Sequence, residues 1–184
     1  MKKKVDGERQ TELLTTTISS GKQALASLRT VVSQLNSAES WGVADMMGGG
    51  MAATMVKRNK INNAKRLATV AKERMANFNR KLRENTVQDV PALGAALDEM
   101  RGFSAFADYF LDGFLTDFFV QRQVVTARSS CHQAIQQVSN VLRTLELQVT
   151  AVQRELVNCE REQTALVLSF GVENQNVPQV HYDL

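Results

Sequence analysis

The sequence predicts an all-α protein, an elongated antiparallel helical bundle of the coiled-coil kind, formed as one domain by residues 1–172. The 184 residues contain only two prolines, Pro91 and Pro178, and are rich in residues that helices favour. Apolar residues recur over long stretches at alternating spacings of four and three, as in helices that pack side by side along their length. These observations together favour helices throughout and predict no strand.

The first long helix is predicted over residues 8–37. Its apolar seam consists of Leu14, Ile18, Gly21, Leu25, Leu28, Val32 and Leu35. A second long helix has the seam Ile61, Ala64, Ala68, Ala71, Met75, Phe78 and Leu82, whose alanines allow a partner helix to approach closely. This helix is expected to end near Asn85, because Pro91 pushes the residue before it into an extended conformation.

The last segment is predicted to form the longest helix, after a short helix over 91–100 that has Pro91 in its first turn. Its seam consists of Val124, Ala127, Cys131, Ile135, Val138, Leu142, Leu145, Val149, Val152, Leu156, Cys159 and Leu166. A helix of about 50 residues is roughly 75 Å long, so it needs a long partner from its own chain or from a second copy. Beyond Gly171 the periodicity ends, and residues 173–184 are expected to form a loosely ordered tail.

The two halves of the chain, roughly 8–86 and 91–172, resemble each other. A shift of 63 residues aligns the pair Ala44–Asp45 with Ala107–Asp108, and it also aligns Gly50 with Gly113. In each half a short apolar element is followed by a glycine and then by a long helix with an apolar seam. The sequence therefore predicts two pseudo-repeated helical hairpins.

Three consecutive glycines, Gly48 to Gly50, stand before the second long helix. Glycine destabilises a helix interior by roughly 1 kcal/mol relative to alanine, so these residues either interrupt the chain or admit a close neighbour. Because the second half has large aromatic residues in the corresponding region, we expect the aromatic element to pack on the glycines. The residues expected at this contact are Trp41, Asp45, Gly48, Gly49, Gly50, Thr54, Phe106, Asp108, Phe110, Gly113, Phe114 and Phe118.

A phosphate cradle is the alternative role for the same glycines. Their backbone N–H groups and the start of the following helix would hold an anion, with Thr54, Lys57 and Arg58 nearby. The spacing of the known phosphate loops is missing, which favours the packing role.

Charge is distributed unevenly along the chain. Residues 51–86 contain ten lysines and arginines against two glutamates, whereas residues 87–120 contain six acidic residues against one arginine. The basic face of the second long helix is expected to include Lys57, Arg58, Lys60, Lys65 and Arg66. Such a face can bind nucleic acid or an anionic membrane. Because no nucleic-acid motif accompanies it and an acidic segment follows, we expect no nucleic-acid partner and leave a membrane surface open.

Asp45, Asp108 and Asp112 are the candidates for a metal site. Asp108 and Asp112 share one helix face, and Asp45 is the repeat counterpart of Asp108. The Glu-x-x-His pairs of di-metal bundles are missing, so capping of helix starts by Asp45 and Asp108 is the favoured role. Neither a cofactor motif nor a nucleophile with histidine and carboxylate partners is found, and we predict neither a cofactor nor an enzyme.

Two blocks of the sequence carry a resemblance. The block Trp41-Gly42-x-x-Asp45-Met46-x-Gly48-Gly49-Gly50 with Thr54-Met55-x-Lys57, and the block Phe106-Ala107-Asp108-Tyr109-Phe110-x-Asp112-Gly113 with Asp117-x-Phe119-Val120, resemble paired blocks in a group of uncharacterised bacterial long-helical proteins. The resemblance covers roughly residues 13–147. It implies a bacterial, cytoplasmic, helical protein and transfers no catalytic residue.

The leading hypothesis is a non-enzymatic interaction or scaffold protein that self-associates, as a dimer, and binds an unidentified protein partner. A membrane-surface helical protein of phage-shock type, which would use the Phe-rich segment 103–120, is the competing hypothesis. A small metal- or anion-binding bundle is the third. A cytoplasmic location is favoured because no signal sequence or membrane-spanning stretch is found and both cysteines are expected to be unpaired.

Overall fold

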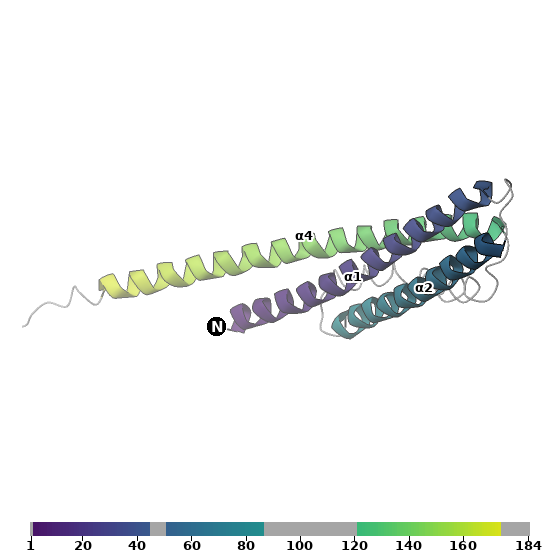
Figure 1. Cartoon of the computed structure of the whole chain (residues 1–184). Coiled ribbons are helices and arrows are strands. Elements are labelled where there is room, and N and C mark those ends of the chain that lie inside the picture. Colours follow the sequence, from purple (N-terminus) through teal and green to yellow (C-terminus); the bar gives the residue numbers. More distant parts are fainter. Residues whose placement is uncertain (1, 45–50, 87–120, 174–184) are drawn as a thin grey trace, which may run out of the picture.

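The protein forms three long helices in the part of the chain that the structure, a computed structural model, describes: residues 2–44, 51–86 and 121–173. These are α1 (Lys2–Ala44), α2 (Met51–Thr86) and α4 (Gln121–Glu173). Within these ranges there is no strand, which confirms the all-α prediction. Figure 1 shows that the three helices lie side by side in an elongated body, with α4 extending furthest from it.

Helix α1 is longer than predicted at both ends. It begins at Lys2 instead of near Glu8, although Gly7 lies in its first turns. A Cβ at Gly7 would lie 2.7 Å from Leu156 Cδ2 of α4, so this glycine lets α4 pack closely instead of ending the helix. The contact with α4 therefore explains why α1 continues toward its N-terminus.

The ends of the other two helices agree closely with the prediction. Helix α2 ends at Thr86, one residue after the predicted Asn85, and α4 has 53 residues and ends at Glu173. The predicted short helix over 91–100 and the tail beyond Glu173 lie outside the described residues.

Helix α1 packs against α2 and α4 along much of its length. Residues near the start of α1 contact residues near the end of α4, and later residues of α1 contact earlier residues of α4. Lys4 Nζ lies 2.7 Å from Glu160 Oε1, and Lys22 Nζ lies 2.7 Å from Glu146 Oε1. The contacts with α2 also run in reverse order along the two chains, as the polar contacts below show. Helix α1 is therefore the central element, and the other two helices cover different faces of it.

The predicted seams form the core. In α1, six of the seven seam positions are buried, and Leu25 is partly buried and packs on the core. In α2, buried Ala68, Ala71, Met75, Phe78 and Leu82 match the predicted seam. The α4 seam is buried or partly buried from Cys131 to Cys159. The side chains of Ile61, Ala64, Val124 and Ala127 lie outside the described set.

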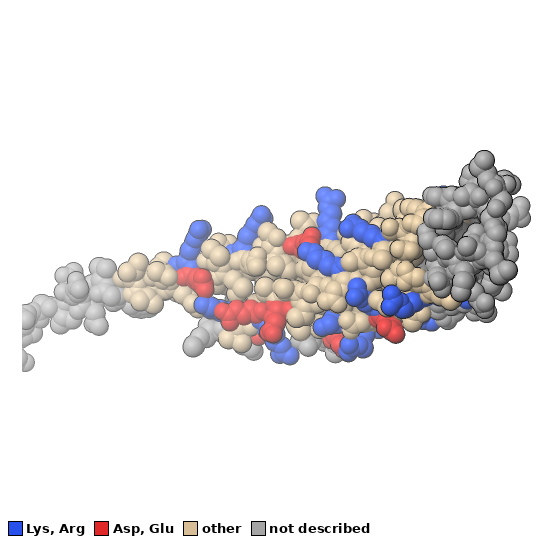
Figure 2. Space-filling view, viewed as in Figure 1, with Lys and Arg blue, Asp and Glu red and all other residues tan. Residues whose placement is uncertain are grey.

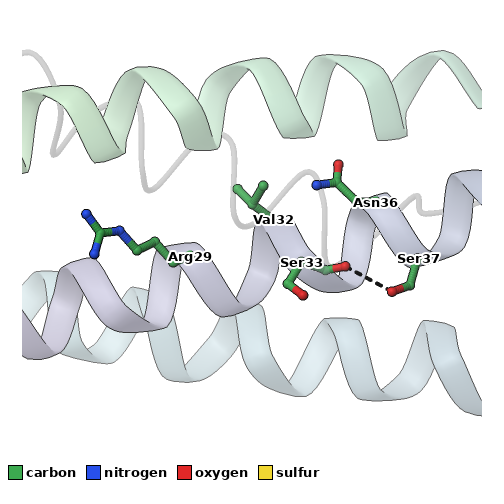
Figure 3. A pocket seen from close by; sticks show the side chains of 5 residues that line it. All are labelled: Arg29, Val32, Ser33, Asn36 and Ser37. Carbon is green, nitrogen blue, oxygen red and sulfur yellow. Dashed lines mark hydrogen bonds between the residues drawn. The ribbon is translucent and has the colours of Figure 1, made fainter.

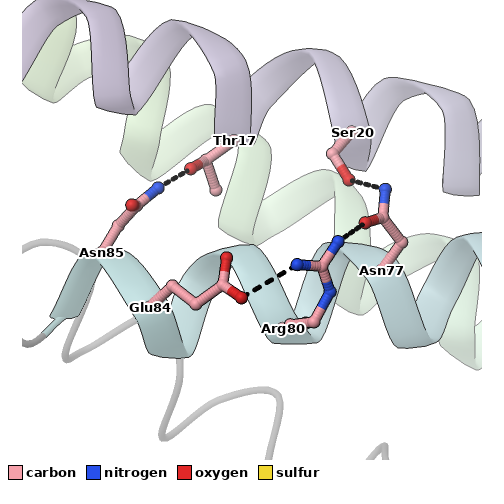
Figure 4. A network of polar contacts seen from close by, with 6 residues as sticks. All are labelled: Thr17, Ser20, Asn77, Arg80, Glu84 and Asn85. Carbon is pink, nitrogen blue, oxygen red and sulfur yellow. Dashed lines mark hydrogen bonds and ion pairs between the residues drawn. The ribbon is translucent and has the colours of Figure 1, made fainter.

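A second buried face of α1 was not predicted. It consists of Thr17, Ser20, Ala24, Ser27 and Val31, each 5% exposed or less. Hydroxyl groups on this face lie against polar side chains of α2 (Figure 4). Arg74 Nη1 donates to Ser27 Oγ at 2.8 Å, Asn77 Nδ2 to Ser20 Oγ at 3.2 Å and Asn85 Nδ2 to Thr17 Oγ1 at 2.7 Å.

These polar contacts fix how α1 and α2 align. Thr17 Oγ1 also donates to the Leu13 carbonyl within α1, so its donor and acceptor capacities are both used. A slide of α2 by one turn would take the Asn85 amide away from Thr17 Oγ1, and a buried amide without its partner costs about 1–3 kcal/mol. On the solvent side Arg80 bonds Asn77 Oδ1 and Glu84 Oε1, each at 2.8 Å, and holds Asn77 in place.

Gly21 lies where the three helices meet. A Cβ at this position would lie 2.8 Å from Leu142 Cδ2 of α4 and 2.8 Å from Phe78 Cε2 of α2. Phe78 is fully buried and Leu142 is 5% exposed, so neither side chain has free space to move into. The absence of a side chain at Gly21 allows both partner helices to approach α1 at the same level.

Candidate interaction surface

The predicted contact between glycines and aromatic residues falls mainly outside the described residues. This applies to Asp45 and Gly48 to Gly50, and to every candidate in the second block, namely Phe106, Asp108, Phe110, Asp112, Gly113, Phe114 and Phe118. Trp41 lies in the last turns of α1 and Thr54 in the first turns of α2. The ends of α1 and α2 thus flank the glycines, and the contact itself stays a prediction.

The basic face is described only in part. Lys57, Arg58 and Lys60 lie in α2, and their side chains are outside the described set. Lys65 is partly buried, whereas Arg66 is exposed and donates to Asn63 Oδ1 at 3.2 Å. Further along α2, Arg74 donates to Ser27 of α1, and Arg80 makes the contacts with Asn77 and Glu84 that Figure 4 shows. Arg74 therefore links α2 to α1, whereas the contacts of Arg66 and Arg80 lie within α2.

Helix α4 extends beyond the N-terminal end of α1. The last buried apolar residue of its seam is Val152, and Leu156 and Cys159 are half-buried. Among the described residues, the Lys4–Glu160 ion pair is the one furthest along α4, and the pKa of Lys4 is raised by its hydrogen bond and ion pair with Glu160. Every residue from Arg161 to Ser169 is exposed.

The middle of this extension is apolar despite its exposure. Leu166, Val167 and Leu168 are 57%, 71% and 65% exposed. Residues 163–172 contain no charged side chain. Leu166 was predicted to belong to the seam, and it follows Cys159 by one heptad, but α1 does not reach it. The extension, residues 161–173, is thus the part of α4 whose seam lacks a partner within the described chain.

A shallow hollow on α1 offers no catalytic group. It is lined by Arg29, Val32, Ser33, Asn36 and Ser37 (Figure 3). Ser37 Oγ donates to the Ser33 carbonyl of its own helix. Because none of the described residues that line this hollow is a histidine, cysteine or carboxylate, they provide neither a nucleophile with a base nor a set of metal ligands.

A second hollow lies between α1 and α4. Its floor includes Leu25 and Leu142, and its rim includes Arg29, Arg143 and the Lys22–Glu146 ion pair. The rim carboxylate is already bound to a lysine. This hollow is therefore a groove between packed helices with charged edges.

The described residues also lack a metal-binding cluster and a membrane-spanning helix. These residues contain no cluster of three or more histidine, cysteine, aspartate or glutamate side chains suited to a metal ion. None of the three described helices is long and apolar enough to cross a membrane. The metal candidates Asp45, Asp108 and Asp112 lie outside these ranges.

Both cysteines are free thiols, as the sequence predicts. Cys131 is buried in the core and Cys159 is half-buried on α4. Burial raises the pKa of the Cys131 thiol from 9.0 to about 11, because the thiolate would lose its hydration.

Cys131 is expected to make the protein less stable at alkaline pH. Between pH 9 and 11 the unfolded chain loses the thiol proton while the folded chain keeps it, so the unfolding free energy falls as the pH rises. The stabilisation is complete below pH 9, and the loss by pH 11 is roughly 2–3 kcal/mol. Urea unfolding of the wild type and of Cys131→Ala across this range measures the effect. Parallel pH dependences of the two proteins would contradict it.

The described residues therefore form a three-helix body with three exposed apolar residues, Leu166 to Leu168, near the end of α4. Comparisons with models of protein families, with curated proteins and with solved structures find no match for this chain.

Proposed function

We propose that the protein is a non-enzymatic helical scaffold that self-associates and binds a protein partner. One observation carries the proposal: nine consecutive residues of α4, 161–169, are exposed although they include Leu166, Val167 and Leu168. Contiguous exposed apolar side chains mark sites where another macromolecule binds. A stiff helix that extends from a packed body is also suited to presenting such a site.

An antiparallel bundle of two pseudo-repeated halves is the architecture we infer. The reverse order of contacts between α1 and each partner supports antiparallel packing. The predicted shift of 63 residues superimposes buried positions of α2 on buried positions of α4, namely Ala68 on Cys131, Ala71 on Ala134, Met75 on Val138, Phe78 on Val141 and Leu82 on Leu145. If α2 and α4 are related helices that pack on one central helix, their buried positions should match under this shift, as these do.

Self-association through the extension follows from the continuity of the seam. Leu166 and Val167 lie on the side of α4 that α1 covers earlier in the helix, because Leu156 and Cys159 precede them at heptad-like spacings. The extension of a second copy, running in the opposite direction, would cover them as α1 covers the rest. The overlap is short, about 20 Å for the roughly 13 residues of the extension, so we expect a dimer that dissociates on dilution.

A cytoplasmic location is part of the proposal. Its support is the two free thiols, Cys131 and Cys159, since unpaired cysteines are the rule in a reducing compartment.

The dimer is tested by measuring molar mass over a range of protein concentrations, by light scattering and sedimentation. We expect the wild type to shift from monomer to dimer as the concentration rises. The variant Leu166→Gln/Val167→Gln is expected to raise the dissociation constant at least about tenfold, because its apolar contacts lie on the seam.

Leu168→Gln is the matched control. Its side chain is as exposed as that of Leu166 but projects from the other side of the helix, since residues two apart do not share a face. Its dissociation constant should equal that of the wild type. A monomer at every concentration would contradict self-association, and equal weakening by both variants would contradict the use of the seam.

A further inference from the structure

The outer edge of α4 has a line of apolar and basic side chains that the proposed dimer does not use. The line consists of Leu147, Arg154, Val157, Arg161 and Leu168, called the outer stripe from here on. Its members are separated by seven, three, four and seven residues, so they lie on one face of the helix. This face is displaced by two residues from the buried seam, and hence lies on the opposite side of α4 from α1.

All five side chains of the outer stripe are exposed. Leu147 and Leu168 are 65% exposed and Val157 is 46% exposed. Figure 2 shows basic side chains projecting in a row from the edge of α4 that faces away from the rest of the bundle. In the described part of the chain, Arg154 and Arg161 form no ion pair, in contrast to Lys4 and Lys22 on α1.

The two threonines that lie between the members of the line need no hydrogen-bond partner from another protein. Thr150 and Thr164 complete the spacing of four and three between the members, and both are exposed. Their hydroxyls donate to the carbonyls of Glu146 and Glu160 in the same helix, at 3.0 and 2.9 Å. Each threonine therefore uses its donor within α4, and a partner can pack on its methyl group.

The spacing indicates that the partner is a helix. Alternation of four and three residues is the pattern that matches a second helix packed lengthwise, because each apolar side chain then fits between those of the neighbour. From Leu147 to Leu168 the line is about 32 Å long, which corresponds to three heptads of a partner helix. Arginine is also a residue that protein interfaces favour.

The charges indicate that this helix is acidic. Arg154 and Arg161 lie within the line, so carboxylates on the facing helix would reach them. A second copy of α4 would place arginine against arginine, which disfavours use of the stripe for the dimer. Two glutamates that flank the line, Glu146 and Glu160, are already bound by lysines of α1 and so oppose an acidic helix little. Glu155 and Glu162 each follow an arginine by one residue and do not share its face. The regular spacing of the line favours a helix over the uniform surface of an anionic membrane.

We infer that the outer stripe of α4 is the docking surface for an acidic amphipathic helix of a protein partner. The inference rests on the partner-binding half of the proposed function and is independent of the dimer. It assigns Leu147, Val157 and Leu168 to the apolar contact and Arg154 and Arg161 to the recognition of carboxylates.

The experiment uses a synthetic four-heptad peptide with leucine at the two seam positions and glutamate at the flanking positions. A second peptide has the same leucines and lysine in place of glutamate. Binding of each labelled peptide to the full chain is measured by fluorescence anisotropy at low and high salt. We expect the acidic peptide to bind, with an affinity that falls as salt rises, and the basic peptide not to bind.

Two double variants with the same change in net charge separate the stripe from general electrostatics. Arg154→Glu/Arg161→Glu should weaken binding of the acidic peptide about tenfold, since two exposed ion pairs are each replaced by a like-charge pair. Arg9→Glu/Arg83→Glu changes exposed arginines of α1 and α2 and should change the affinity by less than about twofold. Circular dichroism of both variants checks that they remain folded.

Several outcomes would overturn the inference. These are equal binding of the two peptides, no binding of the acidic peptide, or equal weakening by the two double variants. Binding of the stripe to phosphatidylglycerol vesicles without binding of the peptide would assign the surface to membranes instead. Because the readout is peptide binding, a protein that stays monomeric but binds the acidic peptide contradicts only self-association, and a dimer that ignores the peptide contradicts only the docking surface.

Discussion

Replacing Gly21 with leucine is expected to lower the unfolding free energy by at least about 3 kcal/mol. The first added carbon would already lie 2.8 Å from Phe78 and from Leu142, and three more carbons would follow it. Overpacking of a core usually costs 1–3 kcal/mol, and here two helices would have to move away from α1 at once. The gain of about 1 kcal/mol in helix propensity offsets only part of this cost. Urea unfolding followed by circular dichroism, at one fixed protein concentration, measures the change.

Gly7→Leu is the matched control for this substitution. At Gly7 the nearest contact is also short, 2.7 Å to Leu156 Cδ2, but it involves only α4, and Leu156 is half-buried. The side chain of Leu156 therefore has room to turn toward solvent, and the net loss should be below about 1 kcal/mol. Equal losses at the two glycines would contradict the view that three helices meet at Gly21.

Phe78→Ala is expected to cost about 3–5 kcal/mol, the range for truncating a buried aromatic side chain. Phe78 is fully buried, and its ring contacts α1 at Gly21. Removing it leaves a cavity between helices whose backbones are held by other contacts, such as the bonds of Asn77 and Asn85 to α1. The midpoint of urea unfolding should fall accordingly.

Leu168→Ala serves as the control for Phe78→Ala, because it also truncates an apolar side chain but one that is 65% exposed. Its effect should lie within about 0.5 kcal/mol of zero. The variant Phe78→Leu/Gly21→Ala adds a second test, since a smaller side chain on α2 makes room for a methyl group on α1. This pair should be more stable than the sum of its single effects, and additive effects would show that the two positions do not contact each other.

The fold was largely predictable from the sequence because its core follows a simple periodicity. Leucines, isoleucines and valines at alternating spacings identified the seam of α1, and the low proline content identified the length of α4. The second buried face of α1 was missed because Thr17, Ser20 and Ser27 are small and polar. Hydroxyls that donate within their own helix and accept from a neighbour bury at little cost, and an apolar pattern does not reveal them.

The proposed interaction surfaces were less predictable. The pattern of α4 placed Leu166 in the seam, but its side chain is 57% exposed because the described part of α1 does not cover it. The outer stripe was overlooked because a line with arginines among leucines resembles an ordinary solvated face. The sequence does indicate it, because the residues of the stripe and the threonines between them also alternate at spacings of four and three. This second pattern is displaced by two residues from the pattern of the buried seam. The candidates around Gly48 to Gly50 and Phe106 to Phe118 stay predictions, since they fall outside the described residues.

The central position of α1 has a consequence for synthesis on the ribosome. Helix α1 is made first, yet its two partners contact each other little, and each contacts mainly α1. Helix α2 completes one side after a short delay, whereas the residue that binds Lys4 is Glu160, near the end of the chain. The part of α1 around Lys4 therefore waits longest for its partner in the nascent protein, and chaperones would find their target there.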